Sequence, residues 1–187
     1  MVHTFHHDFE TVTLAYFNRY PNPYSNHVKS IDTIERHIDS DGKLHQTKII
    51  HKSGRLPVWV KPFLGKINSS WIVERTIVDP IHKTMITYNC NMDHTKLLRI
   101  EESTSYRYDF NRSVTDSDAT VKFSSGFRKF GFGGLNLRDR IENWSKARFA
   151  EHSKTSRQGL KIVMDTVRQK MAHRIQSQRI QGQSYGM

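Results

Sequence analysis

Three polar side chains stand in a helical stripe that a protein core would fill with Leu or Ile. Arg148, His152 and Thr155 follow one another at spacings of four and three residues, which places them on one face of a helix. The same spacing joins them to Ile141, Trp144, Gly159, Val163, Val167 and Met171. Because a buried charge without a partner is costly, this stripe predicts either an ion pair or a bound anion.

Two kinds of partner would satisfy Arg148. One is a carboxylate on a neighbouring strand, such as Glu101 or Glu102. The other is a phosphate group, whose oxygens match the guanidinium bidentately. The surrounding segment is strongly basic, with thirteen Lys and Arg against four Asp and Glu between residues 128 and 179. We therefore favour the phosphate and interpret the three polar residues as the part of a cavity that receives an anionic head group.

The segment 52–70 combines large apolar side chains with residues that interrupt regular structure. Gly54, Pro57, Pro62 and Gly65 break every helical or strand period. The residues expected to cover a ligand are Leu56, Pro57, Val58, Trp59, Val60, Phe63 and Leu64. A long apolar loop in a compact domain is usually functional, so we predict a lid over an apolar ligand.

The order of the remaining patterns predicts an α+β fold. A short strand is expected at residues 2–7 and a helix at 9–20, with Asp8 as its N-cap. Further strands are expected at 28–38, 43–51, 71–79, 84–92, 96–109 and 119–125, with a hairpin turn at 39–42 and a polar turn at 111–118. A long helix is expected from about 136 to 175. An antiparallel meander needs one covered face, so we predict a curved sheet of about seven strands wrapped around that helix, with a cavity between them.

Composition limits the class of protein. The net charge of +11, from 29 basic and 18 acidic residues, favours anionic partners. The one cysteine, Cys90, excludes an internal disulfide framework. The sequence has no apolar run of membrane-spanning length and no recognisable N-terminal signal, so composition alone predicts a cytosolic protein. We find no motif of a hydrolase, a P-loop or a dinucleotide site, and we expect no enzymatic activity, no cofactor and no metal site.

Two strings resemble motifs of the PRELI-like family of mitochondrial lipid-transfer proteins. They are Phe17-Asn-Arg-Tyr-Pro-Asn-Pro-Tyr-Ser-Asn-His-Val28 and, at the start of the lid, Lys52-Ser-Gly-Arg-Leu-Pro-Val-Trp59. Shorter matches follow in the family's order at Ser30-Ile-Asp-Thr-Ile34, Trp71-Ile-Val-Glu74, Val78-Asp-Pro80 and Val121-Lys-Phe-Ser-Ser-Gly-Phe127. The resemblance implies a START-like, helix-grip fold and a carrier of phosphatidic acid that supports cardiolipin synthesis. The phosphatidylserine carriers of the family are the nearest alternative.

The resemblance also implies a head-group site. Arg19 and His27 match a pocket arginine and a pocket histidine of the family; we favour the pocket role for Arg19 over balancing a helix dipole, whereas His27 could equally be an ordinary strand residue. Lys52 and Arg55 match basic residues that flank the start of the lid. On the long helix, the members of the site are Arg148 at a lysine position, His152 at an asparagine position and Thr155 where a lysine is expected. The departure at Thr155 leaves the choice between phosphatidic acid and phosphatidylserine open.

Partners and location follow from the same resemblance. It implies a heterodimer with a small helical-hairpin protein that carries twin Cys-x9-Cys motifs. It also implies the mitochondrial intermembrane space, with peripheral association to the inner membrane. We expect a single lipid-transfer domain at residues 1–175 and a flexible tail at 176–187. The residues alone leave two other classes open, a basic nucleic-acid-binding module and a membrane tether. The apolar lid has no role in the former, so we expect no nucleic-acid partner.

Overall fold

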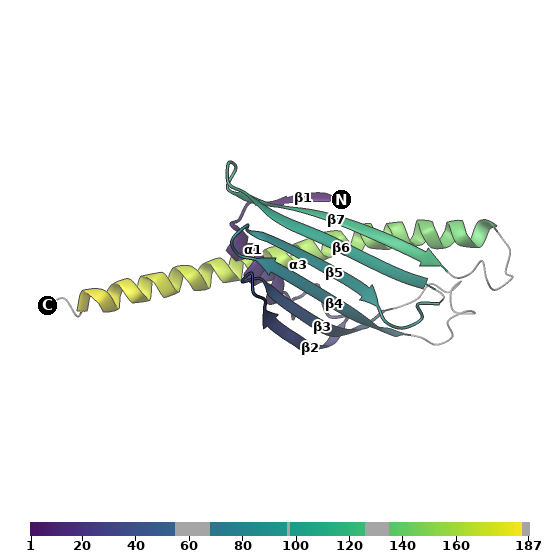
Figure 1. Ribbon diagram of the computed structural model, residues 1–187, viewed down its shortest axis with the longest axis horizontal. Coiled ribbons are helices and arrows are strands. Elements are labelled where there is room, and N and C mark those ends of the chain that lie inside the picture. The colour runs from purple at the N-terminus through teal and green to yellow at the C-terminus, as the bar shows by residue number, and fades with distance from the viewer. Residues whose placement is uncertain (55–67, 97, 126–134, 185–187) are drawn as a thin grey trace.

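The computed structural model describes residues 1–54, 68–96, 98–125 and 135–184. These residues form an antiparallel sheet and two helices, of which the second is very long (Figure 1). The elements are β1 Val2–Phe5, α1 Phe9–Phe17, β2 Val28–Ile38, β3 Leu44–Ser53, β4 Ser69–Asp79, β5 Thr84–Asn91, β6 Leu98–Asp109, β7 Val114–Ser125 and α3 Leu135–Ser184. The predicted α+β class and the wrapping of a sheet around one long helix are confirmed.

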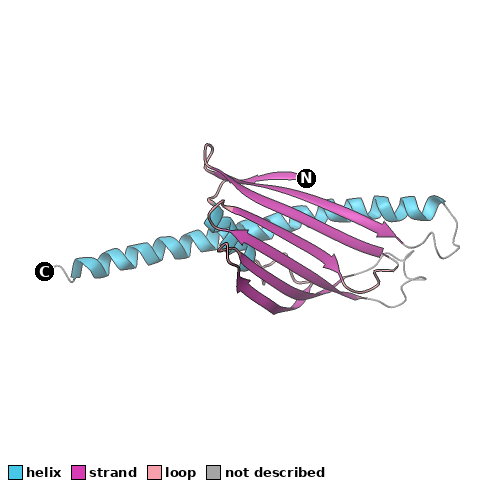
Figure 2. Cartoon of the chain, in the orientation of Figure 1, coloured by secondary structure: helices cyan, strands magenta, loops and turns pink. Residues whose placement is uncertain are grey.

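The sheet has seven strands in the order β1-β7-β6-β5-β4-β3-β2, and every neighbouring pair is antiparallel. From β2 to β7 the strands therefore form a meander, and β1 adds to its free edge (Figure 2). The hairpin between β2 and β3 turns at Gly42, whose positive φ of 77° suits a residue without a Cβ. The predicted turn at residues 39–42 is therefore confirmed.

One face of the sheet, which we call the inner face, is turned toward the helices. The core lies at one end of this face, where α1 is placed between the sheet and α3 (Figure 1). Its buried members are Phe5, Phe9, Val12, Ala15, Tyr16, Val78, Met85, Tyr106, Leu160 and Met164. Asp8 caps α1 by accepting a hydrogen bond from the Thr11 amide at 2.7 Å, as predicted.

The two largest departures from the predicted boundaries are in β7 and α3, and α1 also ends at Phe17 rather than at residue 20. β7 begins at Val114, although residues 111–118 read as a polar turn. The polar side chains of this stretch bind the neighbouring edge strand and the turn after it: the Thr115 hydroxyl donates to the His7 carbonyl at 3.0 Å and the Ser117 hydroxyl to the His3 carbonyl at 3.1 Å. Polarity here reflects bonding across the strands rather than a turn.

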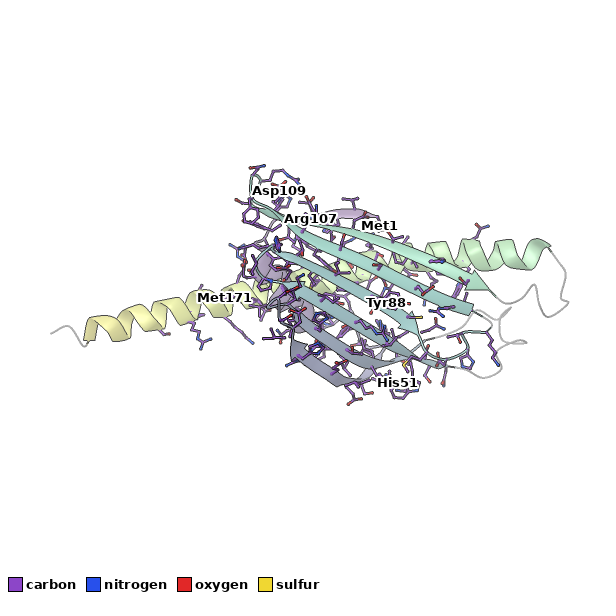
Figure 3. The ribbon with its side chains drawn as sticks, viewed as in Figure 1. Met1, His51, Tyr88, Arg107, Asp109 and Met171 are labelled. Carbon is purple, nitrogen blue, oxygen red and sulfur yellow. The ribbon has the colours of Figure 1, made fainter. Side chains whose placement is uncertain are left out.

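The second difference concerns the long helix, which continues to Ser184 instead of ending near residue 175. The residues expected to form a flexible tail are therefore helical as far as 184. Gln, which occurs four times between residues 176 and 184, is a good helix former, and no Pro stops the helix. The C-terminal part of α3 projects beyond the sheet, and Met171 lies on this part (Figure 3). No helix in the described part of the chain combines the length and the apolar character that spanning a membrane requires.

Candidate functional site

A small pocket opens where the segment after α1 meets the middle of α3. Its volume is about 20 Å³, close to the space of one water molecule. The residues that line it are Arg19, Tyr20, Asn22, Tyr24, Ser25, His27, His152, Thr155 and Ser156. Four residues predicted from the sequence, Arg19, His27, His152 and Thr155, are thus brought together from two distant segments. A phosphate group is larger than one water molecule, so its entry requires lining side chains to move, and Tyr24 and His152 are exposed among them.

The segment after α1 is fixed by its own hydrogen bonds. The Asn22 amide nitrogen Nδ2 donates to the Arg19 carbonyl at 2.5 Å, and its Oδ1 accepts from the Tyr24 amide at 2.8 Å. The Ser25 hydroxyl accepts from the Asn22 amide at 2.8 Å. On the opposite side, α3 presents Gly159, which is buried and lies so close that a Cβ there would be 2.7 Å from Asn22 Oδ1. The small residue allows the helix and the segment to meet and form the pocket.

Arg19 forms the floor of the pocket and is already neutralised by the protein. Its side chain is buried and makes an ion pair with Glu74 of β4, which is also buried. The guanidinium also donates to the Tyr16 carbonyl at 2.8 Å and lies over the Tyr16 ring at 3.9 Å. Burial opposes the charge on Arg19, but Glu74 together with Tyr16 and Tyr20 outweighs it and raises the pKa of the guanidinium. Arg19 therefore orders the floor and offers a ligand less charge than a free arginine would.

Two histidines face each other across the pocket. The rings of His27, at the start of β2, and His152, on α3, are 6.0 Å apart and nearly perpendicular. The Nε2 atom of His27 is buried, and it has no hydrogen-bond partner among the described residues. An unpaired buried nitrogen is costly unless a ligand satisfies it. The pocket thus holds a polar atom that awaits a partner.

Both histidines are neutral at neutral pH. Burial, followed by the charges of Lys52 and Arg148, lowers the pKa of His27 below its ordinary value. For His152, burial followed by Lys52, His27 and other positive neighbours lowers the pKa to about 4. The His152 side chain is accessible to solvent and yet surrounded by protein, as expected for a group that lines a concavity. The empty site therefore resists additional positive charge.

Lys52 and Arg148 complete the cationic surroundings without lining the pocket itself. Lys52 is half-buried at the end of β3, and its charge acts on both histidines. Arg148 is exposed and pairs with Glu151 of the same helix at 2.9 Å. The alternative of a partner on a strand is wrong, because Glu101 bonds Arg99 and Tyr88 instead, and Glu102 makes no bond to Arg148.

The rest of the predicted helical stripe is only partly inward. Thr155, Val163 and Val167 are half-buried and Met171 is exposed, whereas Leu160 and Met164 carry the contact with the core. The Thr155 hydroxyl donates to the Glu151 carbonyl at 2.9 Å, a bond within the helix. The stripe drifts because 3.6 residues per turn do not match an exact repeat of three and four. The side chain of Ile141, Arg55 and the lid residues 56–64 lie outside what the structure describes.

Sequence reasoning missed several residues of the site. Tyr20, Asn22, Tyr24, Ser25 and Ser156 line the pocket, and Glu74 holds its floor. Glu74 carried one usable signal: it occupies an inward position in a strand, between Ile72 and Thr76, where a carboxylate requires a partner. The others follow from the path of the chain after α1, which residue spacing does not reveal.

Beyond the core, the inner face of the sheet remains partly accessible in the described part of the chain. The row of paired positions next to the floor consists of Lys48, Glu74, Asn89, Glu102 and Val121, of which Glu74 alone is buried. Farther from α1, the inward side chains of Ile72, Ile100 and Phe123 are only half-buried. Apolar residues that face the helix without being fully buried are packed less tightly than those of the core. Polar groups thus lie toward one end of this face and apolar groups toward the other.

An antiparallel sheet wrapped around one long helix is the arrangement of START-like, helix-grip folds. The solved structure of TTHA0849 from Thermus thermophilus shares this fold, with a TM-score of 0.54 over 89% of this chain and 96% of that chain, at 11% sequence identity.

Sequence comparison identifies the family. The sequence profile of the PRELI-like family matches residues 10–170. The mitochondrial protein UPS1 of Saccharomyces cerevisiae is 48% identical over 162 residues, which cover 87% of this chain and 89% of that protein. The ups1 homolog of Schizosaccharomyces pombe is 40% identical over 157 residues, which cover 83% and 88%. The chain belongs to the PRELI-like family of mitochondrial lipid-transfer proteins, and the resemblance noted in the sequence is confirmed.

Proposed function

We propose that this protein carries phosphatidic acid between mitochondrial membranes across the intermembrane space and so supports cardiolipin synthesis. The observation that carries the proposal is the pocket itself. Residues from the segment after α1 and from α3, separated by more than a hundred positions, meet there around an unpaired buried nitrogen of His27. A phosphate monoester supplies the acceptor oxygens that such a donor-rich site needs.

The two parts of the lipid match the two ends of the inner face. The head group lies near His27, His152 and Lys52, and the acyl chains extend along the half-buried Ile72, Ile100 and Phe123. Removing each methylene of a chain from water contributes about 0.8 kcal/mol. The lid predicted at residues 52–70 would close over the chains. Binding and transport require no bond to be broken, so we assign the protein as a carrier rather than an enzyme.

The partner and the location belong to the same proposal. A small helical-hairpin protein with twin Cys-x9-Cys motifs, oxidised in the intermembrane space, would bind this chain as a heterodimer. Cys90 is buried and free, so the chain would contribute no disulfide to that complex. The protein would associate peripherally with the inner membrane through its positive charge.

One observation favours phosphatidylserine as a second candidate cargo. Glu102 lies on the inner face, and its carboxylate makes no hydrogen bond or ion pair with any residue that the structure describes. Burial raises the pKa of this carboxyl, although Lys52 and Arg19 act in the opposite direction. A carboxylate in such a place could receive the ammonium group of a serine head group. Competition between the two lipids decides between them.

The test is transfer of fluorescent phosphatidic acid from donor to acceptor vesicles. We expect Arg148→Glu to slow transfer by about tenfold or more, because the new carboxylate repels the phosphate near the histidines. Lys161→Glu is the matched control, since Lys161 is exposed on the same helix and does not line the pocket. Both variants change the net charge equally, so general attraction to the membrane is held constant. If the two variants transfer at the same rate, the head-group assignment is wrong. If unlabelled phosphatidylserine competes better than unlabelled phosphatidic acid, the cargo is phosphatidylserine.

A further inference from the structure

The proposed head-group pocket contains two imidazoles and an unpaired nitrogen, which is more than binding of a permanent anion requires. Lysine and arginine suffice to neutralise a phosphate, and they are already present in Lys52 and Arg148. Histidine differs from both because its charge depends on its surroundings near neutral pH. Phosphate monoesters and diesters also differ in this respect: a monoester has a second ionisation near pH 6, whereas a diester keeps a single charge.

We propose that His27 and His152 form a proton-accepting pair, which takes up a proton when a phosphate monoester enters the pocket and so selects monoester head groups over diesters. This inference rests on the proposed function and adds to it the basis of head-group selection. The step breaks no covalent bond other than the bond to the transferred proton. The proton comes from solvent or from the monoanion of the phosphate, and it ends on an imidazole nitrogen that then donates to a phosphate oxygen.

The geometry supplies both partners of this step. The two ring centroids are 6.0 Å apart, so one phosphate group is large enough to reach nitrogens of both rings once the lining side chains move. His27 Nε2 is buried without a partner in the described residues, so it is free to bond the ligand. His152 is accessible and can turn toward the same oxygen. Two nitrogens on opposite walls can hold two oxygens of one phosphate.

The charges around the pair explain why the proton arrives only with the ligand. The charged groups that act on the pair are Arg19 after α1, Lys29 on β2, Lys52 on β3 and Arg148 on α3, and Tyr20 lines the same pocket. Lys48 on β3, Glu74 on β4 and Glu102 on β6 lie on the inner face of the sheet, and Glu151 on α3 pairs with Arg148. Arg19 and Glu74 cancel one another, which leaves an excess of positive charge. In the empty pocket, burial first and this excess of positive charge second keep both imidazoles neutral. A dianion reverses the local potential and makes protonation favourable.

The affinity for a phosphate monoester is expected to depend on pH. The bound state holds more protons on the histidines than the free state does, so affinity for a monoester rises as pH falls from about 8 toward about 6. Below that range the phosphate itself becomes protonated and the gain ends. A diester supplies one charge and no proton, so its affinity changes less over the same range.

Isothermal titration calorimetry with short-chain lipids that are monomeric in water tests the inference. Dihexanoyl phosphatidic acid and dihexanoyl phosphatidylglycerol are titrated into the protein near pH 7, in two buffers of different ionisation enthalpy, to count the protons exchanged. We expect phosphatidic acid to bring about one proton into the complex and phosphatidylglycerol to bring about none. The His152→Asn variant is expected to lose most of this uptake and to bind phosphatidic acid about tenfold more weakly, with little change for phosphatidylglycerol. Asparagine keeps a polar group of similar size but cannot titrate.

Controls separate the possible failures. His173→Asn changes an exposed histidine on the same helix and should behave as wild type. Circular dichroism verifies that each variant is folded. If phosphatidic acid binds with the same proton uptake in His152→Asn and in His27→Asn, this inference is overturned and the proposed function stands. If phosphatidic acid does not bind the wild-type protein at all, the proposed function itself fails. If inorganic phosphate binds as tightly as the lipid with equal proton uptake, the pocket is a site for free phosphate and the lipid part is overturned.

Discussion

Arg19 and Glu74 are the residues on which the pocket floor depends. Both side chains are buried and form an ion pair between the end of α1 and the middle of the sheet. Removing one partner of a buried pair leaves the other charge without compensation, and such changes typically destabilise by about 3–5 kcal/mol. We therefore expect Glu74→Gln to lower the free energy of unfolding by an amount in this range, measured by urea denaturation.

An exposed pair provides the control for this experiment. Arg99→Gln removes a charge from the exposed Arg99–Glu101 pair on the outer face and should leave the denaturation midpoint nearly unchanged. Equal midpoints for wild type and Glu74→Gln would show that Arg19 is not held as described. The pair also affects how pocket variants are chosen. Arg19→Glu would disrupt the fold as well as the site, so loss of transfer in that variant would not identify a ligand contact.

At the scale of single residues, the sequence predicted which residues line the pocket better than it predicted their ion pairs. Arg19, His27, His152 and Thr155 were expected in one site and all line the pocket. The ion pair of Arg148 with Glu151 was not expected, because helical spacing allows a bond to i+3 as readily as a bond across the space. Which carboxylate pairs with an arginine depends on the distances between residues in the folded chain. Spacing along the sequence does not give these distances. The placement of these residues does not by itself test their role in binding, which stays a prediction.

Among the structural elements, α3 and the segment after α1 meet at their closest point at Gly159. In most helices a Gly to Ala change is favourable by about 1 kcal/mol. Here a Cβ would lie 2.7 Å from Asn22 Oδ1 and 2.9 Å from Nδ2, and both atoms are held by hydrogen bonds to the backbone. Overpacking of this kind costs about 1–3 kcal/mol, so we expect Gly159→Ala to be destabilising overall by about 1 kcal/mol.

Thermal unfolding of two matched variants measures this effect. Gly54→Ala is the control, since a Cβ at Gly54 meets no atom within 4 Å among the described residues. The midpoint of Gly159→Ala should fall below that of wild type, whereas Gly54→Ala should stay close to it. A higher midpoint for Gly159→Ala would mean that Asn22 moves aside without loss and that the close approach does not shape the pocket.

The elements themselves were largely predictable, and the exceptions share a cause. Alternation identified the strands of the meander because most of them turn one partly buried face toward α1 and α3, although β2 has no buried residue. It failed at β7, where Thr115 and Ser117 are buried polar residues that bond to backbone carbonyls near the N-terminus. It also placed the end of α3 too early, because a helix that projects beyond the sheet has no apolar stripe to follow. In both places, contacts or exposure set by the tertiary structure override the local pattern.

For the whole molecule, the net charge of +11 is concentrated on α3, and part of that helix extends beyond the sheet (Figure 1). Three exposed basic residues of α3, Arg168, Lys170 and Arg174, lie within three positions of Met171. Vesicles that contain phosphatidylglycerol carry the opposite charge and should attract the protein. The attraction acts over the Debye length, which falls from about 30 Å at 0.01 M salt to about 8 Å at 0.15 M. We therefore expect binding to such vesicles to weaken by about tenfold or more over this range.

Flotation of the protein with vesicles in a density gradient measures this prediction. Binding to neutral phosphatidylcholine vesicles should be weak and nearly independent of salt. Changing Arg168, Lys170 and Arg174 together to Gln should reduce binding to anionic vesicles at low salt and flatten the salt dependence, because each charge near the surface contributes about 1 kcal/mol of attraction. Retention of the bound lipid in the pocket should be unaffected, since these residues do not line it. Binding that is equally strong at both salt concentrations would show that apolar contacts, rather than the basic helix, bring the protein to the membrane.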